Sequence, residues 1–339
     1  MNLEGKISFQ NAILEPNEVT QKILNGEFLV LAGDRQVLDG LPSGNWIGGT
    51  IPYFMGENGG HIDQKKIYTT TIAGITNEST PRISMYDKTS ISRISQEAPS
   101  NGFTLLIMPA GSDVHLDYAQ SAPEYPNMFF SPIIGWIAGT HLDEINTNKP
   151  KVGFGPAGLL SEDKAVVMHV PLGEDQFANV NIVNLFEQGN SASIEFKTNG
   201  FSIENCVVDG QETSFSQYIK DNGIDTRLPL VADYCGVMVN VSIQEVLDDK
   251  VNLYAPVFEN TSYRFAKPID DYVTEFDKAI AQETSGSSSF ACNCILNFLY
   301  GELEGRKTGN ITGPMTFGEV AYQLVNQTMV YLTLEDTTI

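Results

Sequence analysis

Basic residues and long apolar runs are scarce in this sequence. Its 339 residues include 20 Lys and Arg against 42 Asp and Glu, which gives a formal net charge of −22. Because such a surface repels phosphate groups and anionic lipids, binding to nucleic acid or to a membrane surface is disfavoured. The apolar runs are only as long as strands, so no membrane insertion is expected.

Cysteine is also sparse, with four residues at positions 206, 235, 292 and 294. The first residues lack the basic and apolar regions of a secretory signal. We therefore expect a cytoplasmic protein in which Cys206, Cys235, Cys292 and Cys294 are all reduced. No Cys-x-x-Cys, His-x-x-x-His or Glu-x-x-His spacing occurs, so no metal site is predicted.

Known catalytic and cofactor motifs are missing or out of context. There is no Gly-x-Ser-x-Gly elbow, no P-loop and no kinase signature. Gly153, Gly155 and Gly158 match the spacing Gly-x-Gly-x-x-Gly. However, Pro156 lies inside this motif, and the following residues favour a strand where a dinucleotide site needs a helix. These glycines are better explained as turn residues.

A short tryptophan-containing stretch occurs twice. Residues 45–50 and 135–140 share Trp, Ile, the second Gly and Thr, and they contain both tryptophans of the chain. A buried apolar strand is expected before each copy, at 28–34 and 103–109. We therefore predict a duplicated helix–strand–strand unit of α/β type.

The duplication gives a specific structural expectation. Residues 28–75 and 103–172 should superpose, with Trp46 and Trp136 in equivalent positions. A strand that carries glycine allows another chain or a bulky ring to approach closely. The copies should differ at residues 111–127, which are expected to form an enlarged loop.

The helices expected elsewhere follow from capping residues and apolar spacing. They are predicted at residues 16–26, 215–219 and 270–282, while 82–100 is expected to be a connection or a short helix. Strands are predicted at 290–296 and at 326–334. We assign residues 1–175 to one domain and 176–339 to a second, in an α/β fold (α+β is the alternative) with mixed sheets.

The C-terminal unit resembles the FIST family, named for F-box and intracellular signal transduction proteins. Its cysteine-bearing strand would carry Cys292 or Cys294, its Gly-aromatic-Gly-Glu segment would correspond to Phe317-Gly318-Glu319, and its Asn-x-Thr strand would start at Asn326. The family often has Arg after the cysteine strand and His before the Asn-x-Thr pair. This chain has Ile295 and Val325 there, so the resemblance is to a divergent member.

The resemblance implies a non-enzymatic sensor that binds a small ligand and relays the signal to a partner protein. We expect the ligand-binding residues to be Cys294, Glu319, Asn326, Phe317 and Tyr322. Apolar walls with a few converging polar groups are typical of such sites, and a carboxylate at Glu319 would suit a cationic amine. No catalytic residue is assigned.

A structural or scaffold protein with no ligand is one alternative, and two further alternatives involve a substrate or a cofactor. One is an enzyme of unknown reaction that uses Cys294 as nucleophile with a distant histidine. The other is a haem-binding gas sensor, since haem occurs in one branch of the FIST family. His115 or His141 are candidate haem ligands, but nothing in the sequence selects between them.

Overall fold

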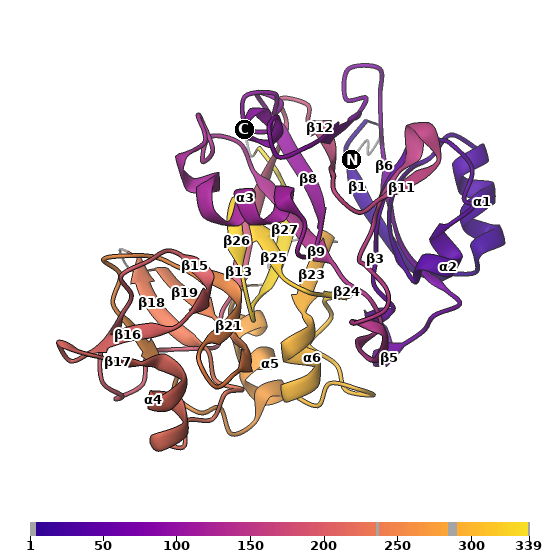
Figure 1. Ribbon diagram of the computed structural model, residues 1–339. Helices are drawn as coiled ribbons and strands as arrows, with labels where there is room; N and C mark the ends of the chain where they lie inside the picture. The colour runs from indigo at the N-terminus through magenta and orange to yellow at the C-terminus, as the bar shows by residue number, and fades with distance from the viewer. Residues whose placement is uncertain (1–4, 235–236, 284–289, 338–339) are drawn as a thin grey trace.

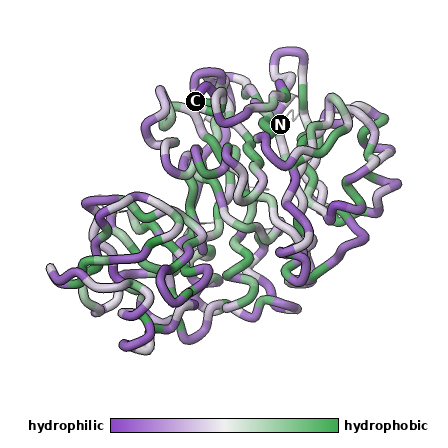
Figure 2. The backbone as a smooth tube through the Cα atoms, viewed as in Figure 1, coloured by the Kyte–Doolittle hydropathy of each residue, from purple (hydrophilic) through white to green (hydrophobic). Residues whose placement is uncertain are grey.

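The computed structural model describes residues 5–234, 237–283 and 290–337, and it shows the expected α/β fold with mixed sheets (Figure 1). Apolar stretches run through the strands inside the molecule, and hydrophilic stretches lie in the outer loops and helices (Figure 2). The chain builds three units in succession, and an insertion interrupts the third.

The first unit comprises eight elements: β1 (Ser8–Leu14), α1 (Pro16–Leu24), β2 (Phe28–Gly33), α2 (Arg35–Leu38), β3 (Trp46–Thr50), β4 (Tyr53–Gly56), β5 (Gly59–Ile62) and β6 (Ile67–Ala73). The expected helix at 16–26 is α1. It starts with Pro16 at its first turn and with a capping box between Glu15 and Glu18.

The second unit repeats this order: β7 (Arg82–Tyr86), η1 (Ile91–Arg93), β8 (Gly102–Pro109), α3 (Asp113–Ser121), η2 (Ala122–Glu124), β9 (Ile133–Ala138), η3 (Leu142–Glu144), β10 (Val152–Phe154), η4 (Gly155–Ala157), β11 (Leu159–Ser161) and β12 (Ala165–Pro171). The glycines at 153–158 thus lie in a hairpin, as the sequence indicated.

The third unit has the same plan: β13 (Gln176–Val183), α5 (Tyr272–Glu283), β23 (Phe290–Cys294), α6 (Ile295–Tyr300), β24 (Gly313–Thr316), β25 (Glu319–Ala321), β26 (Gln323–Val325) and β27 (Met329–Asp336). The insertion between β13 and α5 forms a separate lobe in Figure 1. It contains β14 (Ile194–Glu195), β15 (Gly200–Ile203), β16 (Asn205–Val208), β17 (Gln211–Ser214), α4 (Phe215–Asp221), β18 (Leu230–Tyr234), β19 (Val237–Val241), β20 (Ile243–Val246), β21 (Val251–Val257) and β22 (Tyr263–Phe265).

Three six-stranded sheets share one strand order. The orders are β1-β6-β2-β3-β10-β11, β7-β12-β8-β9-β25-β26 and β13-β27-β23-β24-β4-β5. In each sheet the third and fourth strands are parallel and the other pairs are antiparallel. The predicted duplication is therefore confirmed at the level of topology, and it extends to a third copy.

Each unit contributes a hairpin that pairs with a strand of another unit. The first unit's β4–β5 pairs with β24, the second unit's β10–β11 pairs with β3, and the third unit's β25–β26 pairs with β9. The exchange closes a cycle, so strands from both predicted domains share two of the sheets. The boundary at residue 175 falls between the second and third units.

Glycine permits close packing where the units meet. A Cβ atom added at Gly49 would lie 2.5 Å from the Trp136 ring and 2.8 Å from Ile107. A Cβ at Gly139 would lie 2.3 Å from the Phe317 ring. Real side chains do not approach this closely, so both glycines are required by contacts between units.

The two tryptophans lie on equivalent strands but on opposite faces of their sheets. Trp46 packs with the small core beside α1 and α2, whereas Trp136 packs into the central core, away from α3. The expectation of equivalent tryptophan positions was therefore wrong at the level of side chains. Successive residues of a strand point to opposite faces, so a shift of one residue in alignment reverses the face.

Two local expectations were also wrong. Residues 111–127 contain the helix α3, which Ser112 caps by accepting a hydrogen bond from the His115 amide, and which buries Val114 and Tyr118 four residues apart. Residues 82–86 form the edge strand β7, although residues 82–100 as a whole are mostly polar. The other expected helices, at 215–219 and 270–282, correspond to α4 and α5.

Candidate functional site

The structure brings three of the predicted ligand residues together inside the third unit. Cys294 ends β23, Glu319 begins β25, and Asn326 lies in the connection from β26 to β27. All three side chains are buried. They lie at the carboxyl ends of the parallel strands β23 and β24, where ligand sites of α/β sheets are commonly found.

Glu319 is held by hydrogen bonds from two threonines, in addition to its contact with Cys294. Its Oε2 accepts from the Thr328 amide at 3.2 Å and from the Thr328 hydroxyl at 2.9 Å. Its Oε1 lies 3.3 Å from the hydroxyl of Thr316. Glu319 is thus neither at the start of a helix nor in contact with solvent, because it starts a central strand.

Burial gives this carboxyl an unusual protonation behaviour. It raises the pKa of Glu319 to about 8, although hydrogen bonds from Thr328, Cys294 and Thr316 oppose the rise. At pH 7 the side chain is therefore mostly a neutral acid, able to donate as well as accept a hydrogen bond. The expected role as counter-ion for an amine does not fit a neutral carboxylic acid.

Cys294 is the nearest thiol to this acid. Its side chain hydrogen-bonds Glu319, and Asn326 Nδ2 lies 3.9 Å from its Sγ. Burial, and then the neighbouring Glu319, raise the pKa of the Cys294 thiol well above its ordinary value. Hydrogen bonds from the backbone amides of Leu296 and Gln327 to the sulfur oppose this rise in pKa.

The connection from β26 to β27 ties this cluster to the insertion. Asn326 Oδ1 accepts from the Ser242 amide at 3.1 Å. Gln327 accepts from the Ser242 hydroxyl at 2.7 Å and donates to the Arg227 carbonyl at 3.2 Å. Gln327 also has a φ of 54°, a conformation that costs free energy in residues other than glycine. Strain of this kind is concentrated at functional sites.

Unpartnered polar atoms collect around the same cluster. Among the described residues, six buried side-chain nitrogen or oxygen atoms have no hydrogen-bond partner. Four of them come from α5, β23, α6 and the loop after α6: Tyr272 Oη, Asn293 Nδ2, Asn297 Oδ1 and Thr308 Oγ1. Buried polar groups without a partner are costly and rare, so their grouping indicates a place for a ligand or water.

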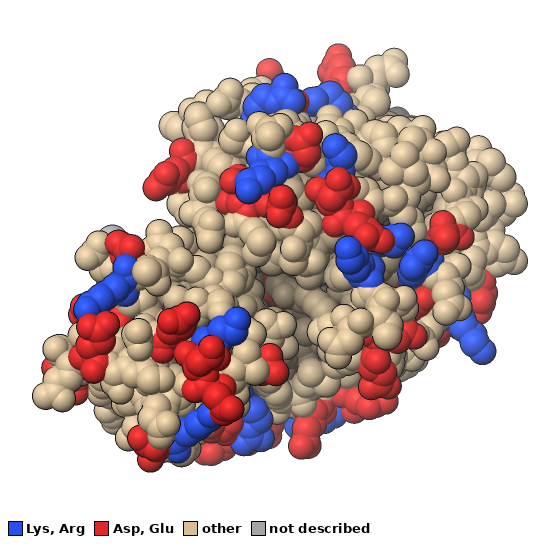
Figure 3. Space-filling model, in the orientation of Figure 1, with Lys and Arg blue, Asp and Glu red and all other residues tan. Residues whose placement is uncertain are grey.

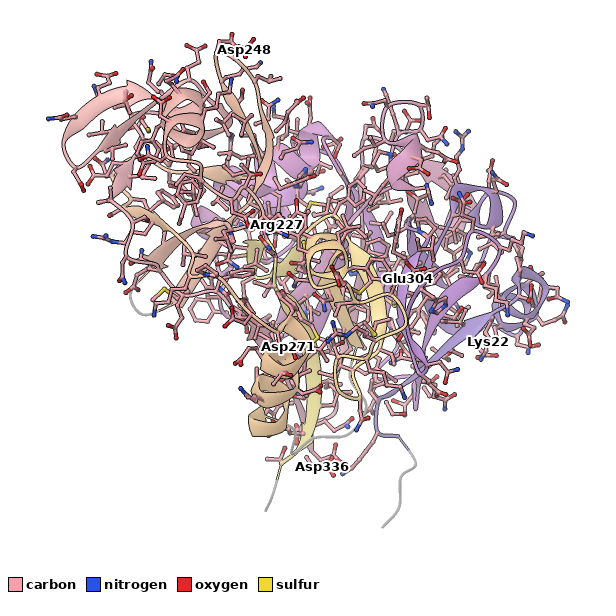
Figure 4. The ribbon with its side chains drawn as sticks, turned by 90° about the horizontal axis from the view of Figure 1, so that it is seen from below. Lys22, Arg227, Asp248, Asp271, Glu304 and Asp336 are labelled. Atoms are coloured by element: carbon pink, nitrogen blue, oxygen red, sulfur yellow. The ribbon has the colours of Figure 1, made fainter. Side chains whose placement is uncertain are left out.

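A cavity of about 130 Å³ opens beside Tyr272, between the insertion and the third unit. The insertion contributes Asp225 and Arg227, and the third unit contributes Tyr272, Tyr300 and Gln327. Arg227 lies where these two parts meet (Figure 4), and the surface is hollowed between the insertion lobe and the rest of the molecule (Figure 3). The volume corresponds to roughly four water molecules at about 30 Å³ each.

Tyr272 connects this cavity to the buried cluster. Its ring packs on Gly301 at the end of α6 and contacts Phe186 and Phe276. Burial raises the pKa of Tyr272 well above its ordinary value, and the neighbouring Cys294 and Glu319 add to the rise. The hydroxyl is therefore a neutral donor between the cavity and the thiol–acid pair.

The other two predicted ligand residues lie elsewhere. The Phe317 ring covers Gly139 at the contact between units. Tyr322 lies in the turn between β25 and β26, where its ring contacts Phe129 and its carbonyl accepts from the Tyr118 hydroxyl. Phe317 lies in the connection from β24 to β25, so neither residue belongs to a strand beside Cys294.

The sequence predicted Cys294, Glu319 and Asn326 but not their partners. In the sequence, Thr328 is only the last residue of the Asn-x-Thr pattern. Tyr272 is one apolar position of the helix predicted at residues 270–282. Asn293 and Asn297, four residues apart in an apolar segment, are a polar pattern that indicates a buried network. The Asn297 amide donates to Asn293 Oδ1 at 2.8 Å.

The remaining candidates form no second cluster of this kind. Cys206, Cys292 and Cys294 are free thiols, and Cys235 lies outside the described residues. The described part of the chain contains no group of three His, Cys, Asp or Glu placed to hold a metal. His115 Nδ1 accepts from the Gly111 amide, and the His141 ring stacks on Tyr53. No helix within the described ranges is both apolar and long enough to span a membrane.

Comparison with known proteins gives a family but no activity. A search of the curated proteins finds no match to the chain. The model of a family of unknown function, DUF6976, matches residues 14–335, which include the insertion and all three units apart from most of β1 and the last residue of β27. The chain therefore belongs to the DUF6976 family.

Proposed function

We propose that this protein binds a small polar ligand in the cavity beside Tyr272, and that it works as a non-enzymatic sensor or binding module. The observation that carries the proposal is Tyr272, which lines the cavity and whose buried, unpartnered hydroxyl is coupled electrostatically to Cys294 and Glu319. A ligand acceptor would satisfy this hydroxyl. Mostly apolar walls with a few polar groups are typical of small-ligand sites.

The position of the cavity supports a sensory role. A ligand there would touch Arg227 of the insertion together with Tyr272 and Gln327 of the third unit. It would thereby strengthen the contact between these two parts of the chain, and differential binding of this kind shifts a conformational equilibrium. Relay to a signalling partner in the cytoplasm rests on the FIST resemblance and stays a prediction.

The test is a thermal-melting screen with amino acids and short carboxylic acids. We expect at least one compound to raise the Tm of the parent, because a ligand that binds only the folded state stabilises it. Tyr272→Phe should abolish that rise while leaving the Tm of the free protein unchanged, since the lost hydroxyl has no partner. Tyr322→Phe is the matched control and should respond like the parent.

A Tyr272→Phe variant that binds as tightly as the parent would remove the proposed site. A response that is lost equally in Tyr322→Phe would assign the ligand to another surface. Both outcomes are readable without knowing the ligand in advance.

A second candidate is an enzyme in which Cys294 is the nucleophile and Glu319 transfers a proton. The hydrogen bond between the thiol and an acid whose pKa is about 8 favours this alternative. Turnover of a bound compound by the parent, together with a covalent adduct on Cys294 in intact-protein mass spectrometry, would support it. Cys294→Ala would then abolish both, but would leave non-covalent binding in a sensor.

A further inference from the structure

The second unit has a groove at the place that corresponds to the Cys294 cluster of the third. It lies beyond the carboxyl end of β8 and beside the connection from β11 to β12. Its volume is about 870 Å³, larger than the cavity beside Tyr272. The groove is open, and it shares no residue with the cavity of the proposed function.

Three lysines line this groove in a chain that has twice as many acidic as basic residues. Lys149 and Lys151 come from the segment before β10, and Lys164 from the segment before β12. Acidic and basic side chains are otherwise interspersed over the face seen in Figure 3. The groove brings three of the chain's 20 basic residues together around one concavity.

Two carboxylates, those of Glu162 and Asp163, line the groove together with the three lysines. Lys151 lies 3.1 Å and Lys149 3.8 Å from the same carboxylate, that of Glu162. Lys164 lies 3.6 Å from Asp87. Among the three lysines, Lys151 is the strongest indication of an anion site. Its side chain is only 16% exposed, and its partner Glu162 is shared with the ammonium group of Lys149. An additional anion between Lys149 and Lys151 would relieve that imbalance.

The groove also has an apolar wall. Met85, Leu159 and Leu160 line it, and Leu159 is 42% exposed. An inorganic ion would leave this wall in water, whereas an organic molecule would cover it.

We propose that the groove of the second unit binds a small organic anion with at least two negative charges, either a phosphate ester or a dicarboxylate. The charged end lies between Lys149, Lys151 and Lys164, and the apolar body covers Leu159 and Leu160. This binding is independent of the ligand proposed for the cavity beside Tyr272.

The test is isothermal titration of the full chain at low ionic strength with two anionic probes, phenyl phosphate and phthalate, and with neutral phthalamide as charge control. We expect one or both anions to bind and phthalamide not to bind. Preference for phenyl phosphate or for phthalate identifies the phosphate ester or the dicarboxylate as the ligand class.

Substitutions in opposite directions separate binding from loss of structure. Lys149→Met with Lys151→Met should weaken binding by about tenfold or more. Glu162→Gln removes the competing carboxylate and should tighten binding several-fold, a gain that misfolding cannot produce. Lys197→Met is the control, because Lys197 is an exposed, paired lysine of the insertion. Absence of binding by both anions at about 10 mM, or equal affinity in the parent and in the Glu162→Gln protein, would overturn the proposal.

Discussion

The second and third units have the same strand order, yet their carboxyl ends are chemically opposite. In the second unit this end is an open groove with three lysines. In the third it is a buried cluster of Cys294, Glu319 and Asn326, covered by α5 and by the insertion. The difference teaches that the repeated scaffold fixes where a site lies, while the loops and the insertion decide its polarity and its access to solvent.

The largest expected effect is on the free energy of unfolding. It appears when the buried Glu319 of the third unit is compared with Glu162 at the groove of the second unit. Glu319→Ala leaves the amide and the hydroxyl of Thr328 without a partner and opens a buried cavity, so we expect the free energy of unfolding to fall by about 3 kcal/mol. Glu162→Ala at the exposed groove should change it by less than about 0.5 kcal/mol. Urea denaturation of both variants measures the contrast, and equal losses would contradict it.

The next effect tests how the units interlock. Gly49→Ala places a methyl group 2.5 Å from the Trp136 ring, so overpacking should cost about 1–3 kcal/mol. Two of the three nearest atoms belong to the far side of the indole, which a phenyl ring lacks, and the third is a methyl carbon of Ile107 at 2.8 Å, whose clash remains. In a Trp136→Phe background the same substitution should therefore cost clearly less. A cost that is independent of residue 136 in this double-mutant cycle would show that the contact is not the cause.

A pH dependence follows from the raised pKa of Glu319. The folded protein retains a proton up to about pH 8, whereas the unfolded chain releases it near pH 4.5. The folded state therefore binds more protons between these values, and its stability falls as pH rises, by up to about 1.4 kcal/mol per pH unit. Glu319→Gln should remove this contribution, and denaturation of parent and variant from pH 5 to pH 8 measures the difference. Parallel pH profiles would contradict the assignment.

The smallest effect compares two buried tyrosines. The Tyr68 hydroxyl lies 2.8 Å from that of Thr312, so Tyr68→Phe should cost about 1 kcal/mol. The Tyr272 hydroxyl has no partner, so Tyr272→Phe should change the free energy of unfolding by less than about 0.5 kcal/mol or increase it. A large loss in Tyr272→Phe would mean that the hydroxyl has a structural partner.

The sequence predicted much of the scaffold because local patterns determine it. The helices at Pro16–Leu24 and Tyr272–Glu283 follow from apolar spacing and helix-start residues. The third copy was not predicted from the sequence. Its second parallel strand, β24, contains Met315 and no tryptophan, and the insertion separates the unit's first strand from its other elements. The opposite orientation of Trp46 and Trp136 follows from strand registers that a repeated hexamer does not show, since Trp46 pairs with Leu29 and Trp136 pairs with Ile107.

The candidate site was predicted only in part for a similar reason. Cys294, Glu319 and Asn326 lie in one C-terminal stretch, so a family-like pattern could identify them together. Tyr272 and Arg227 reach the site from a helix and from the insertion, across long sequence distances. The same distant elements bury Glu319. The local sequence therefore could not predict that Glu319 is a neutral acid.

The central claim is that Tyr272 connects the cavity to the buried cluster of Cys294 and Glu319. The rate of alkylation of the Cys294 thiol tests this claim most directly. In the parent, iodoacetamide should modify Cys294 slowly, because the thiol is buried and its pKa is raised. Tyr272→Ala should enlarge the cavity and accelerate this modification by about tenfold or more, as measured by peptide mass mapping. Cys206, buried in the insertion, should keep its parent rate. An unchanged rate at Cys294, or equal acceleration at Cys206, would contradict the account.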